Sequence, residues 1–351
     1  MSLGPLMIDV AGAELSSEDA DVLRHPLVGS VLLFSRNYRN PQQLAELTAA
    51  IRALRTPQLL IGVDHEGGRV QRFRDGFTRL PASRLLGRRF DEDRGEALRL
   101  SHSIAWLMAS ELRAAGVDFS FAPCVDLDYG VSEIIGDRAF HRHPEAVAAL
   151  AAAYLAGMRE AGMAAIAKHF PGHGAVVADS HVALPVDRRE FVDLEPDLQP
   201  YRLLIENQLP GVMAAHVVYP AVDSLPASLS HRWITDILRG RLGFHGCVFA
   251  DDLSMAGAAA FGDVVKRAQL AFAAGCDILP ICNDRQGVKT VLQALESDVA
   301  SAASQARLVR MRARGEPPGA AALAGSAHWH ETVARIADLT AAPPLVLTEG
   351  R

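Results

Sequence analysis

Residues 144–170 read PEAVAALAAAYLAGMREAGMAAIAKHF, and this stretch contains both of the patterns that decide the fold. Its first part begins at Pro144, repeats apolar residues at helical spacing from Val147 to Met158, and reaches Gly162, where a helix can end. Its second part, residues 164–168, is a mostly apolar run without alternation, which is typical of a strand buried on both faces of a parallel sheet. The stretch therefore predicts a helix followed by a buried parallel strand.

The same order of helix and strand recurs along the chain. Similar apolar runs lie at residues 7–11, 28–34, 59–63, 117–125, 211–216, 247–251 and 276–282. Helical patterns lie between most of them, at residues 41–54, 97–115, 231–240, 263–274 and 285–298. Eight strands that alternate with helices are typical of a closed (β/α)8 barrel, although an open doubly wound sheet gives the same local patterns.

We therefore expect an α/β protein built as a single (β/α)8 TIM barrel with a C-terminal helical extension. This catalytic domain is expected to occupy residues 1–340. Past the last strand, RGEPPG at residues 314–319 is interpreted as a linker and residues 320–339 as a helix. Residues 341–351 are expected to form a loosely ordered C-terminal tail.

Composition and charge argue against several classes of function. The 351-residue chain is 49% hydrophobic and 22% charged with a net charge of −6, which predicts a soluble globular protein. Lys and Arg are scattered singly, so neither nucleic acid nor an anionic membrane is an expected partner. No run of about 18 apolar residues could cross a bilayer, and the N-terminus has no signal pattern, so we expect a cytoplasmic location. The four cysteines form no CxxC pair and are interpreted as buried free thiols.

Ionisable residues follow the predicted strands at the points where the strands end. They are Asp64 with His65 and Glu66, Asp126 and Asp128, Lys168 and His169, His216, and Asp251 with Asp252. In a barrel these ends meet at one mouth, which is where barrel enzymes carry their active sites. A mouth rich in carboxylates, cations and imidazoles suits a polyhydroxylated substrate, a metal, or both. Of these residues, we expect His65, Glu66 and Asp252 to support the site rather than to react.

Two glycine-rich segments belong to the same mouth. In DHEGGRVQR, residues 64–72, the glycine pair allows a tight turn that could present Asp64, Arg69 and Arg72. In KHFPGHGAVVADSHVALP, residues 168–185, glycine and proline oppose helix formation. That segment also gathers Lys168, His169, His173, Asp179 and His181. Loops of this length with so many ionisable groups are more often functional than structural.

Two chemistries fit these residues. In the first, His169, His173 and His181 ligate zinc together with an aspartate at a strand end, and the metal assists hydrolysis. In the second, a glycosidic bond is cleaved by a carboxylate and a proton donor. Asp179 could orient His181, so that His181 serves as acid and base while Asp251 attacks.

Five segments carry a resemblance to a known family. They are IGVDHEGGRVQRF from Ile61, IIGDRAFH from Ile134, AKHFPGHGAVVADSH from Ala167, MAAHVVYPAVD from Met213 and LGFHGCVFADDLSMAG from Leu242. The chain resembles the family 3 glycoside hydrolases, specifically the bacterial cytoplasmic β-N-acetylglucosaminidases of the NagZ type. The similarity runs from about residue 5 to residue 340, and the KHFPGHG loop followed by Asp-Ser-His is its most specific part.

The resemblance implies a retaining exo-β-N-acetylglucosaminidase and assigns roles to particular residues. Asp251 corresponds to the family's nucleophile, and His181 to its acid/base, oriented by Asp179. Binding of the terminal sugar is implied for Asp64, Arg72, Arg138, Lys168 and His169. Relatives usually carry Ser or Thr before the nucleophile, whereas this chain has Ala250. That difference removes a hydroxyl beside the nucleophile and leaves the nucleophile in place.

The same resemblance implies a substrate and a setting. The expected substrate is a small muropeptide or chito-oligosaccharide, and the expected process is peptidoglycan recycling, which links the protein to cell wall biogenesis, cell shape and cell division. No cofactor or metal is expected, and the protein is expected to be a monomer. Some relatives with a histidine acid/base transfer the glycosyl group to phosphate, so a phosphorylase is an alternative beside the zinc-dependent hydrolase.

Overall fold

The computed structural model describes residues 2–177, 184–295 and 301–341. Eight parallel strands form its main sheet: β1 (Leu6–Asp9), β2 (Val28–Leu33), β3 (Leu60–Val63), β6 (Phe119–Ser120), β7 (Ala164–Phe170), β8 (Gly211–Ala214), β9 (Cys247–Ala250) and β10 (Leu279–Ile281). β1 pairs with both β2 and β10, and a bridge between Phe249 and Ile278 connects β9 to the segment that enters β10. The sheet therefore closes on itself, and the predicted (β/α)8 barrel is confirmed over the open sheet.

All eight predicted strands are present, although β6 is shorter than the apolar run 117–125 that predicted it. Pro123 interrupts the regular ladder because proline has no amide hydrogen to donate. Pairing nevertheless continues past it, since the Val125 amide donates to the Lys168 carbonyl at 2.8 Å. This pairing carries the chain after β6 along β7 to the mouth of the barrel.

Side chains fill the inside of the barrel. Phe119, Phe121 and Phe249 meet edge to face, with ring centroids 5.3 to 5.6 Å apart. Leu308 and Met311, from the C-terminal part of the chain, belong to the same buried cluster. The interior is thus a packed core and not a channel, so a substrate has to bind at the mouth.

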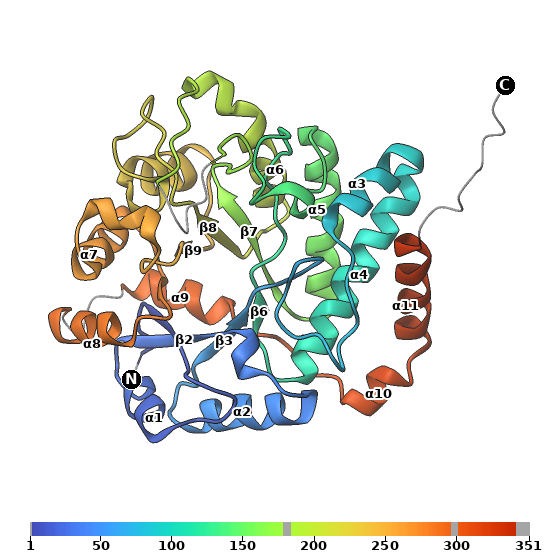
Figure 1. Cartoon of the computed structure of the whole chain (residues 1–351), viewed down its shortest axis with the longest axis horizontal. Helices are drawn as coiled ribbons and strands as arrows, with labels where there is room; N and C mark the ends of the chain where they lie inside the picture. Colours follow the sequence, from blue (N-terminus) through green and yellow to red (C-terminus); the bar gives the residue numbers. More distant parts are fainter. Residues whose placement is uncertain (1, 178–183, 296–300, 342–351) are drawn as a thin grey trace.

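Helices surround the strands (Figure 1). Five predicted helices correspond to α2 (Pro41–Ala53), α4 (Arg94–Ala114), η5 (Arg232–Arg241), α7 (Val264–Ala274) and α8 (Arg285–Ala294), and the helix of the opening stretch is α5 (Pro144–Glu160). The helices that were not predicted are α1 (Ser17–Leu23), α3 (Ser83–Glu92), α6 (Glu195–Glu206) and α9 (Ala302–Arg310). α6 contains Pro196 in its first turn and Pro200 further in, which hides it from a search for uninterrupted periodicity. Short helical turns complete the fold: η1 (Ser35–Asn37), η2 (Gly136–Arg138), η3 (Phe191–Leu194), η4 (Ala227–Leu229) and η6 (Ala256–Phe261).

A small antiparallel hairpin, β4 (His65–Gly67) and β5 (Val70–Gln71), follows β3 directly. Its turn requires glycine, because Gly67 has φ +114° and an added Cβ there would lie 2.4 Å from the Pro81 carbonyl oxygen. The hairpin folds the chain back so that Arg72 returns to Asp64. The predicted tight turn is thus present, and it places both of these side chains at the mouth.

The C-terminal extension consists of α9 (Ala302–Arg310), α10 (Ala320–Ala324) and α11 (Ala327–Thr340). Residues 320–339 are helical as predicted, but they form two helices and not one. The first helix ends at Gly325, and the Ser326 side chain caps the start of α11. α11 lies beside α4 (Figure 1), and the Trp329 indole donates to Glu111 at 2.9 Å. The tail is predicted from residue 341, and residues 342–351 lie outside the described part, so the domain boundary stays a prediction. Within the described residues, no helix is long and apolar enough to cross a membrane.

Candidate active site

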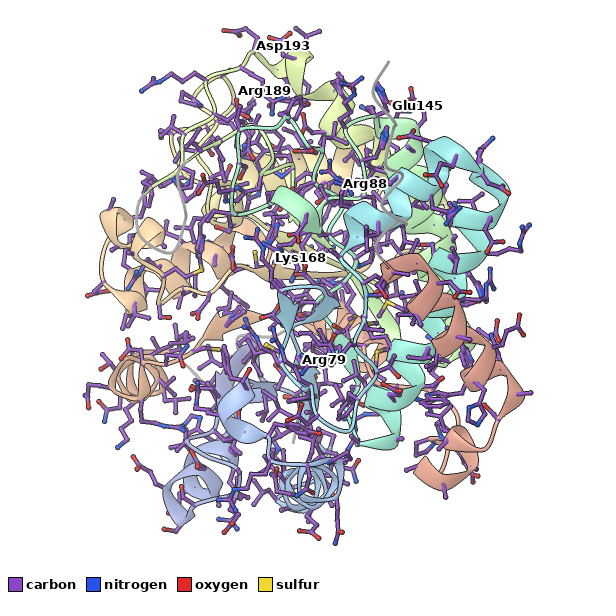
Figure 2. All side chains as sticks on the ribbon, turned by 45° about the vertical axis from the view of Figure 1, so that its right-hand side comes forward. Arg79, Arg88, Glu145, Lys168, Arg189 and Asp193 are labelled. Atoms are coloured by element: carbon purple, nitrogen blue, oxygen red, sulfur yellow. The ribbon has the colours of Figure 1, made fainter. Side chains whose placement is uncertain are left out.

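Lys168 stands at the centre of a buried ionic network at the mouth of the barrel. Its ammonium group lies 2.9 Å from Asp64 Oδ1 and 2.6 Å from Glu66 Oε1, and only 2% of the residue is exposed. Figure 2 shows Lys168 near the centre of the molecule, with Asp193 and Glu145 at its edge. Burial would lower the pKa of Lys168, but the charges of Asp64 and Glu66 raise it above its usual value. The lysine is therefore a fixed cation.

Glu66 connects this lysine to Arg138. The guanidinium of Arg138 donates to both Glu66 carboxylate oxygens, at 2.8 and 2.9 Å, which is the bidentate geometry of strong ion pairs. Burial would raise the pKa of Glu66, but Arg138 and Lys168 lower it to about 2. Glu66 thus supports the site, as expected, by holding two of the predicted sugar-binding residues in place.

Asp64 lies between two cations. Besides Lys168, it meets Arg72, whose guanidinium is 3.4 Å from Asp64 Oδ2. Burial would raise the pKa of Asp64, but the charges of Lys168 and Arg72 hold it well below its usual range. Arg69, which the same turn could have presented, points elsewhere and donates to the carbonyls of Glu133 and Ile134.

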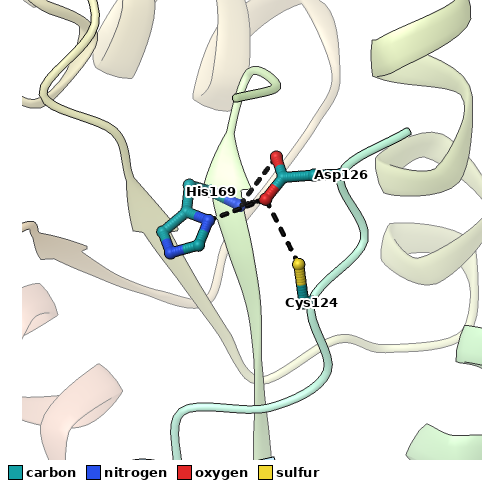
Figure 3. Close-up of side chains that lie close together, drawn as sticks. All are labelled: Cys124, Asp126 and His169. Atoms are coloured by element: carbon teal, nitrogen blue, oxygen red, sulfur yellow. Dashed lines mark hydrogen bonds and ion pairs between the residues drawn. The ribbon is translucent and has the colours of Figure 1, made fainter. Parts of the chain in front are cut away.

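His169 is held by Asp126, as Figure 3 shows. The Asp126 Oδ2 atom lies 2.7 Å from His169 Nδ1, and Asp126 Oδ1 accepts the His173 amide at 2.7 Å. Burial opposes ionisation, but the contacts with His169 and His173 hold the pKa of Asp126 well below its usual range. Since a carboxylate only accepts, Nδ1 of His169 carries the hydrogen and Nε2 faces Arg138, 3.4 Å away.

The sequence places Asp126 at the mouth but gives it no role in the site. Its signal was present, because it follows a predicted strand as Asp64 and Asp251 do. The sequence does not show that Asp126 pairs with His169, because the two residues are 43 positions apart.

Cys124, Asp126 and His169 also offer ligand atoms that lie within 4.8 Å of one another. The Cys124 thiol, however, lies 3.3 Å from Asp126 Oδ2 in hydrogen-bond geometry. Burial, and then the charge of Asp126, raise the pKa of Cys124 well above its usual value, which opposes the thiolate that binds zinc. The trio therefore fits a hydrogen-bonded support for His169 better than a zinc site. Of the predicted zinc ligands, the trio includes His169 and, in Asp126, an aspartate at a strand end, but neither His173 nor His181.

Asp251 follows β9 directly, at the same end of the barrel. Its backbone amide donates to the Ala214 carbonyl at 3.1 Å, and its Oδ1 accepts the Asp252 amide at 2.9 Å. The charge of Asp251 also acts on His173, although burial and His169 together lower the pKa of His173. Neither ring nitrogen of His173 has a hydrogen-bond partner in the described chain. The predicted nucleophile and the glycine-rich loop thus share one region of the mouth.

The strand-end residues that remain support the loops. Asp252 accepts hydrogen bonds from the Ser254 hydroxyl at 2.8 Å and the Cys282 amide at 3.2 Å. Burial raises the pKa of Asp252 to about 6. His216 contacts the Ser228 hydroxyl at 2.5 Å and the Asp252 carbonyl at 3.0 Å. His216 therefore connects the loop after β8 to the loop after β9, and Asp252 connects the loop after β9 to the end of β10.

The predicted acid/base pair, Asp179 and His181, lies in residues 178–183, outside the described part of the chain. Residues on both sides of that segment are described. Before it, the Tyr219 hydroxyl donates to the Gly172 carbonyl at 2.5 Å. After it, Arg189 pairs with Asp187 at 2.6 Å and with Asp197 at 2.9 Å. The start and the end of the glycine-rich loop are thus both fixed to the barrel.

Comparison with protein families shows to which family of proteins the chain belongs. Residues 6–313 match the family model described as the glycosyl hydrolase family 3 N-terminal domain. The chain belongs to glycoside hydrolase family 3. This match covers the whole barrel, from β1 to the end of α9.

Individual relatives agree with the family. The chain is 52% identical to a β-hexosaminidase of Nitrosospira multiformis over 340 residues, which cover 97% of each chain. It is 54% identical to a β-hexosaminidase of Alkalilimnicola ehrlichii over 337 residues, 96% of each chain. Among solved structures it is similar to NagZ from Neisseria gonorrhoeae in complex with N-trifluoroacetyl-D-glucosamine, with a TM-score of 0.92, 43% identity, and coverage of 97% of this chain and 99% of that one. The same gonococcal protein has been solved in complex with a zinc ion, with a TM-score of 0.90, 42% identity and the same coverage.

The predicted family and the predicted enzyme class, a glycoside hydrolase of the β-N-acetylhexosaminidase type, are confirmed by these comparisons. Carbohydrate is accordingly the class of substrate. The roles of the individual site residues stay predictions.

Proposed function

We propose that this family 3 hydrolase removes terminal β-linked N-acetylglucosamine from muropeptides with retention of configuration, in peptidoglycan recycling. The observation that carries the proposal is the buried network of Lys168 with Asp64, Glu66 and Arg138 at the mouth that also bears Asp251. It presents fixed donors and acceptors in a small space, which is what a sugar with several hydroxyls requires. Gonococcal NagZ, with a TM-score of 0.92, was solved with an N-acylated glucosamine, which supports the same class of sugar.

The terminal sugar is bound by five side chains in this proposal: Asp64, Arg72, Arg138, Lys168 and His169. The ionised Asp64 accepts hydrogen bonds from sugar hydroxyls, and Lys168 and Arg138 donate to hydroxyl or acetamido oxygens. Because Glu66 and Asp126 hold Arg138 and His169 before substrate arrives, little side-chain freedom is lost on binding.

Bond cleavage proceeds by double displacement. The Asp251 carboxylate attacks the anomeric carbon while the glycosidic bond breaks, and His181, oriented by Asp179, gives its proton to the departing oxygen. His181 then takes a proton from water, whose oxygen attacks the anomeric carbon and releases Asp251. Two inversions give net retention, and no cofactor enters either step.

The finer points of setting belong to the same proposal. The enzyme acts in the cytoplasm as a monomer, and it processes cell wall fragments during growth and division. Residues 1–340 act as one catalytic domain, followed by a tail that contributes no group to the chemistry.

The test is a product assay on N-acetylglucosaminyl-anhydro-N-acetylmuramic acid with and without its stem peptide, followed by proton NMR. We expect β-N-acetylglucosamine as the first product, at the same rate in phosphate and in a phosphate-free buffer. N-acetylglucosamine 1-phosphate as the product would establish the phosphorylase alternative instead.

A second candidate, zinc-dependent hydrolysis, is kept because gonococcal NagZ was solved with a zinc ion. The same assay after treatment with EDTA separates the two, since double displacement needs no metal and its rate should not change. Loss of activity on chelation, followed by recovery with added zinc, would favour the zinc enzyme.

The role of His181 is tested by comparing leaving groups. General acid assistance matters most for a sugar alkoxide and least for an activated phenolate. His181→Ala should therefore reduce cleavage of a natural disaccharide far more than glycosyl transfer from an activated aryl glycoside, and Asp179→Asn should show a milder form of this difference. Equal losses on both substrates would contradict the assignment.

A further inference from the structure

A cavity of about 540 Å³ lies at the end of the barrel opposite the mouth. Its lining includes Ala164, Pro210 and Cys247, which begin or directly precede β7, β8 and β9. The other walls come from α5 and α6, from the turns that enter these strands, and from α9 with the residues that follow it. The packed interior of the barrel therefore separates this cavity from the proposed catalytic site.

The lining of the cavity is strongly positive. Five arginines and one histidine line it: Arg159, Arg307, Arg310, Arg312, Arg314 and His245. None of the described residues that line it is Asp or Glu, although the whole chain carries a net charge of −6. The lining of the cavity is thus positively charged although the whole chain is negatively charged. This favours binding of an anion in the cavity.

Most of this charge is not neutralised by the protein. Arg307 pairs with Asp277 at 2.7 Å, but Arg159 and Arg312 donate to the uncharged carbonyls of Asn207 and Gln58. Arg310 and Arg314 make no ion pair or side-chain hydrogen bond with any residue in the described ranges. The Arg312 Nη1 atom is buried and has no hydrogen-bond partner there. Arg310 and Arg314 are exposed, so their guanidinium groups can reach an anion in the cavity without breaking an existing contact in the described ranges.

Stabilisation of helix ends explains only part of the arrangement. Arg159 lies in the last turn of α5, and Arg307 and Arg310 lie in the last turn of α9, where cations favour the helix dipole. Arg312 and Arg314 follow α9 and belong to no helix. The dipole therefore accounts neither for these two arginines nor for the unpartnered Nη1 atom.

The rest of the lining is apolar. Leu155, Met163, Leu209 and Phe244 are buried residues that contribute to the wall. A volume of about 540 Å³ falls in the range of small-molecule sites, which combine an apolar lining with a few polar groups. Guanidinium groups suit phosphate in particular, because they donate two parallel hydrogen bonds to its oxygens.

We propose that this cavity binds a small organic phosphate, with the phosphate on Arg310 and Arg314 and the organic part against the apolar wall. Nucleotides and sugar phosphates both have this chemistry. The site is separate from the proposed catalytic function and does not depend on it.

Isothermal titration calorimetry of the full chain with ADP, with glucose 6-phosphate and with inorganic phosphate, at one ionic strength, tests the proposal. At least one organic phosphate should bind one to one and more tightly than inorganic phosphate, and the better of the two identifies the source. The double variant Arg310→Ser, Arg314→Ser should weaken that binding about ten-fold or more while its hydrolytic activity stays unchanged. The control Arg88→Ser, Arg232→Ser removes two exposed arginines that make no described side-chain contact, and it should bind as the natural chain does.

Several results would overturn the proposal. One is binding that survives in the Arg310 and Arg314 variant, and another is equal weakening in the control, which would indicate a general charge effect. The third is displacement of the phosphate by saturating N-acetylglucosamine, which would place it at the mouth. Absence of binding by both organic phosphates, or binding no tighter than that of inorganic phosphate, would also reject an organic phosphate site.

Discussion

Asp251 and Asp252 are neighbours in the sequence but differ in their surroundings. The Asp252 carboxylate is occupied by Ser254 and by the Cys282 amide, so it holds the loop after β9 against the end of β10. Asp251 accepts the Asp252 amide and also acts electrostatically on His173 in the glycine-rich loop. This difference assigns Asp252 to loop structure and leaves Asp251 as the proposed nucleophile.

Asp251→Asn should lower kcat by at least about 10³-fold and leave the affinity for N-acetylglucosamine nearly unchanged, because the amide keeps its shape but loses its nucleophilic charge. Peptide mapping after treatment with a slowly hydrolysed fluorinated glycoside should find the sugar on Asp251. A label on Asp252 or Asp64 would refute the assignment. Asp252→Asn is the matched control and should cost far less activity.

Glu66 should make stability depend on pH in acid. Its folded pKa, about 2, lies below the value of about 4.3 for an unfolded chain, so the unfolded state binds more protons between these values. The stabilisation is present above about pH 4.3 and is lost as the pH falls towards 2. It amounts to roughly 3 kcal/mol at neutral pH.

Glu66→Gln tests this dependence. The variant should be less stable than the natural chain at pH 7, and the difference in the free energy of unfolding should shrink below about pH 4. Urea unfolding at a series of pH values measures it. A difference that stays constant from pH 7 to pH 3 would show that the ionic network contributes no proton linkage.

At the scale of elements, the glycine turn of the β4 and β5 hairpin brings Arg72 back to Asp64. Gly67→Ala should destabilise the protein by about 1–3 kcal/mol and raise KM, because φ +114° is strained for alanine and the new Cβ would meet the Pro81 carbonyl. Gly12→Ala is the control, since nothing lies within 4 Å of its added Cβ. Denaturant unfolding and steady-state kinetics of both variants measure the effect. Equal behaviour of the two would mean that the turn does not position Asp64.

Elements were predicted where the local signal was uninterrupted. The eight apolar runs correspond to strands. A strand that is buried on both faces is apolar along its whole length, so the sequence shows it without knowledge of the strands that pair with it. α6 was missed because Pro196 and Pro200 interrupt its periodicity, and the helix is stabilised by packing against α5 instead. α10 and α11 were predicted as one helix because the spacing does not show that Ser326 starts a new one.

At the scale of the whole molecule, Asp277 connects the start of β10 to distant parts of the chain. It is buried and accepts hydrogen bonds from Arg239, Arg307 and Ser304 at 2.7 to 2.8 Å. Asp277→Ala should cost about 3–5 kcal/mol, because two guanidinium groups lose their counter-charge, and should lower Tm by roughly 4–7 °C. Thermal unfolding should show this loss against the exposed control Asp338→Ala. An unchanged Tm would mean that solvent replaces the lost carboxylate at no cost.

The sequence by itself determined the barrel, the position of ionisable residues at strand ends and the family, because apolar periodicity, glycine turns and motifs are local properties of the chain. Only the tertiary structure decided which of these groups meet. Lys168 reaches Asp64 across 104 positions, and Asp126 reaches His169 across 43. The cavity arginines Arg307, Arg310, Arg312 and Arg314 lie close together in the sequence, but only the fold brings Arg159 to them. Closure of the barrel brings distant strand ends together, and no local pattern records which charges will then lie within hydrogen-bonding distance.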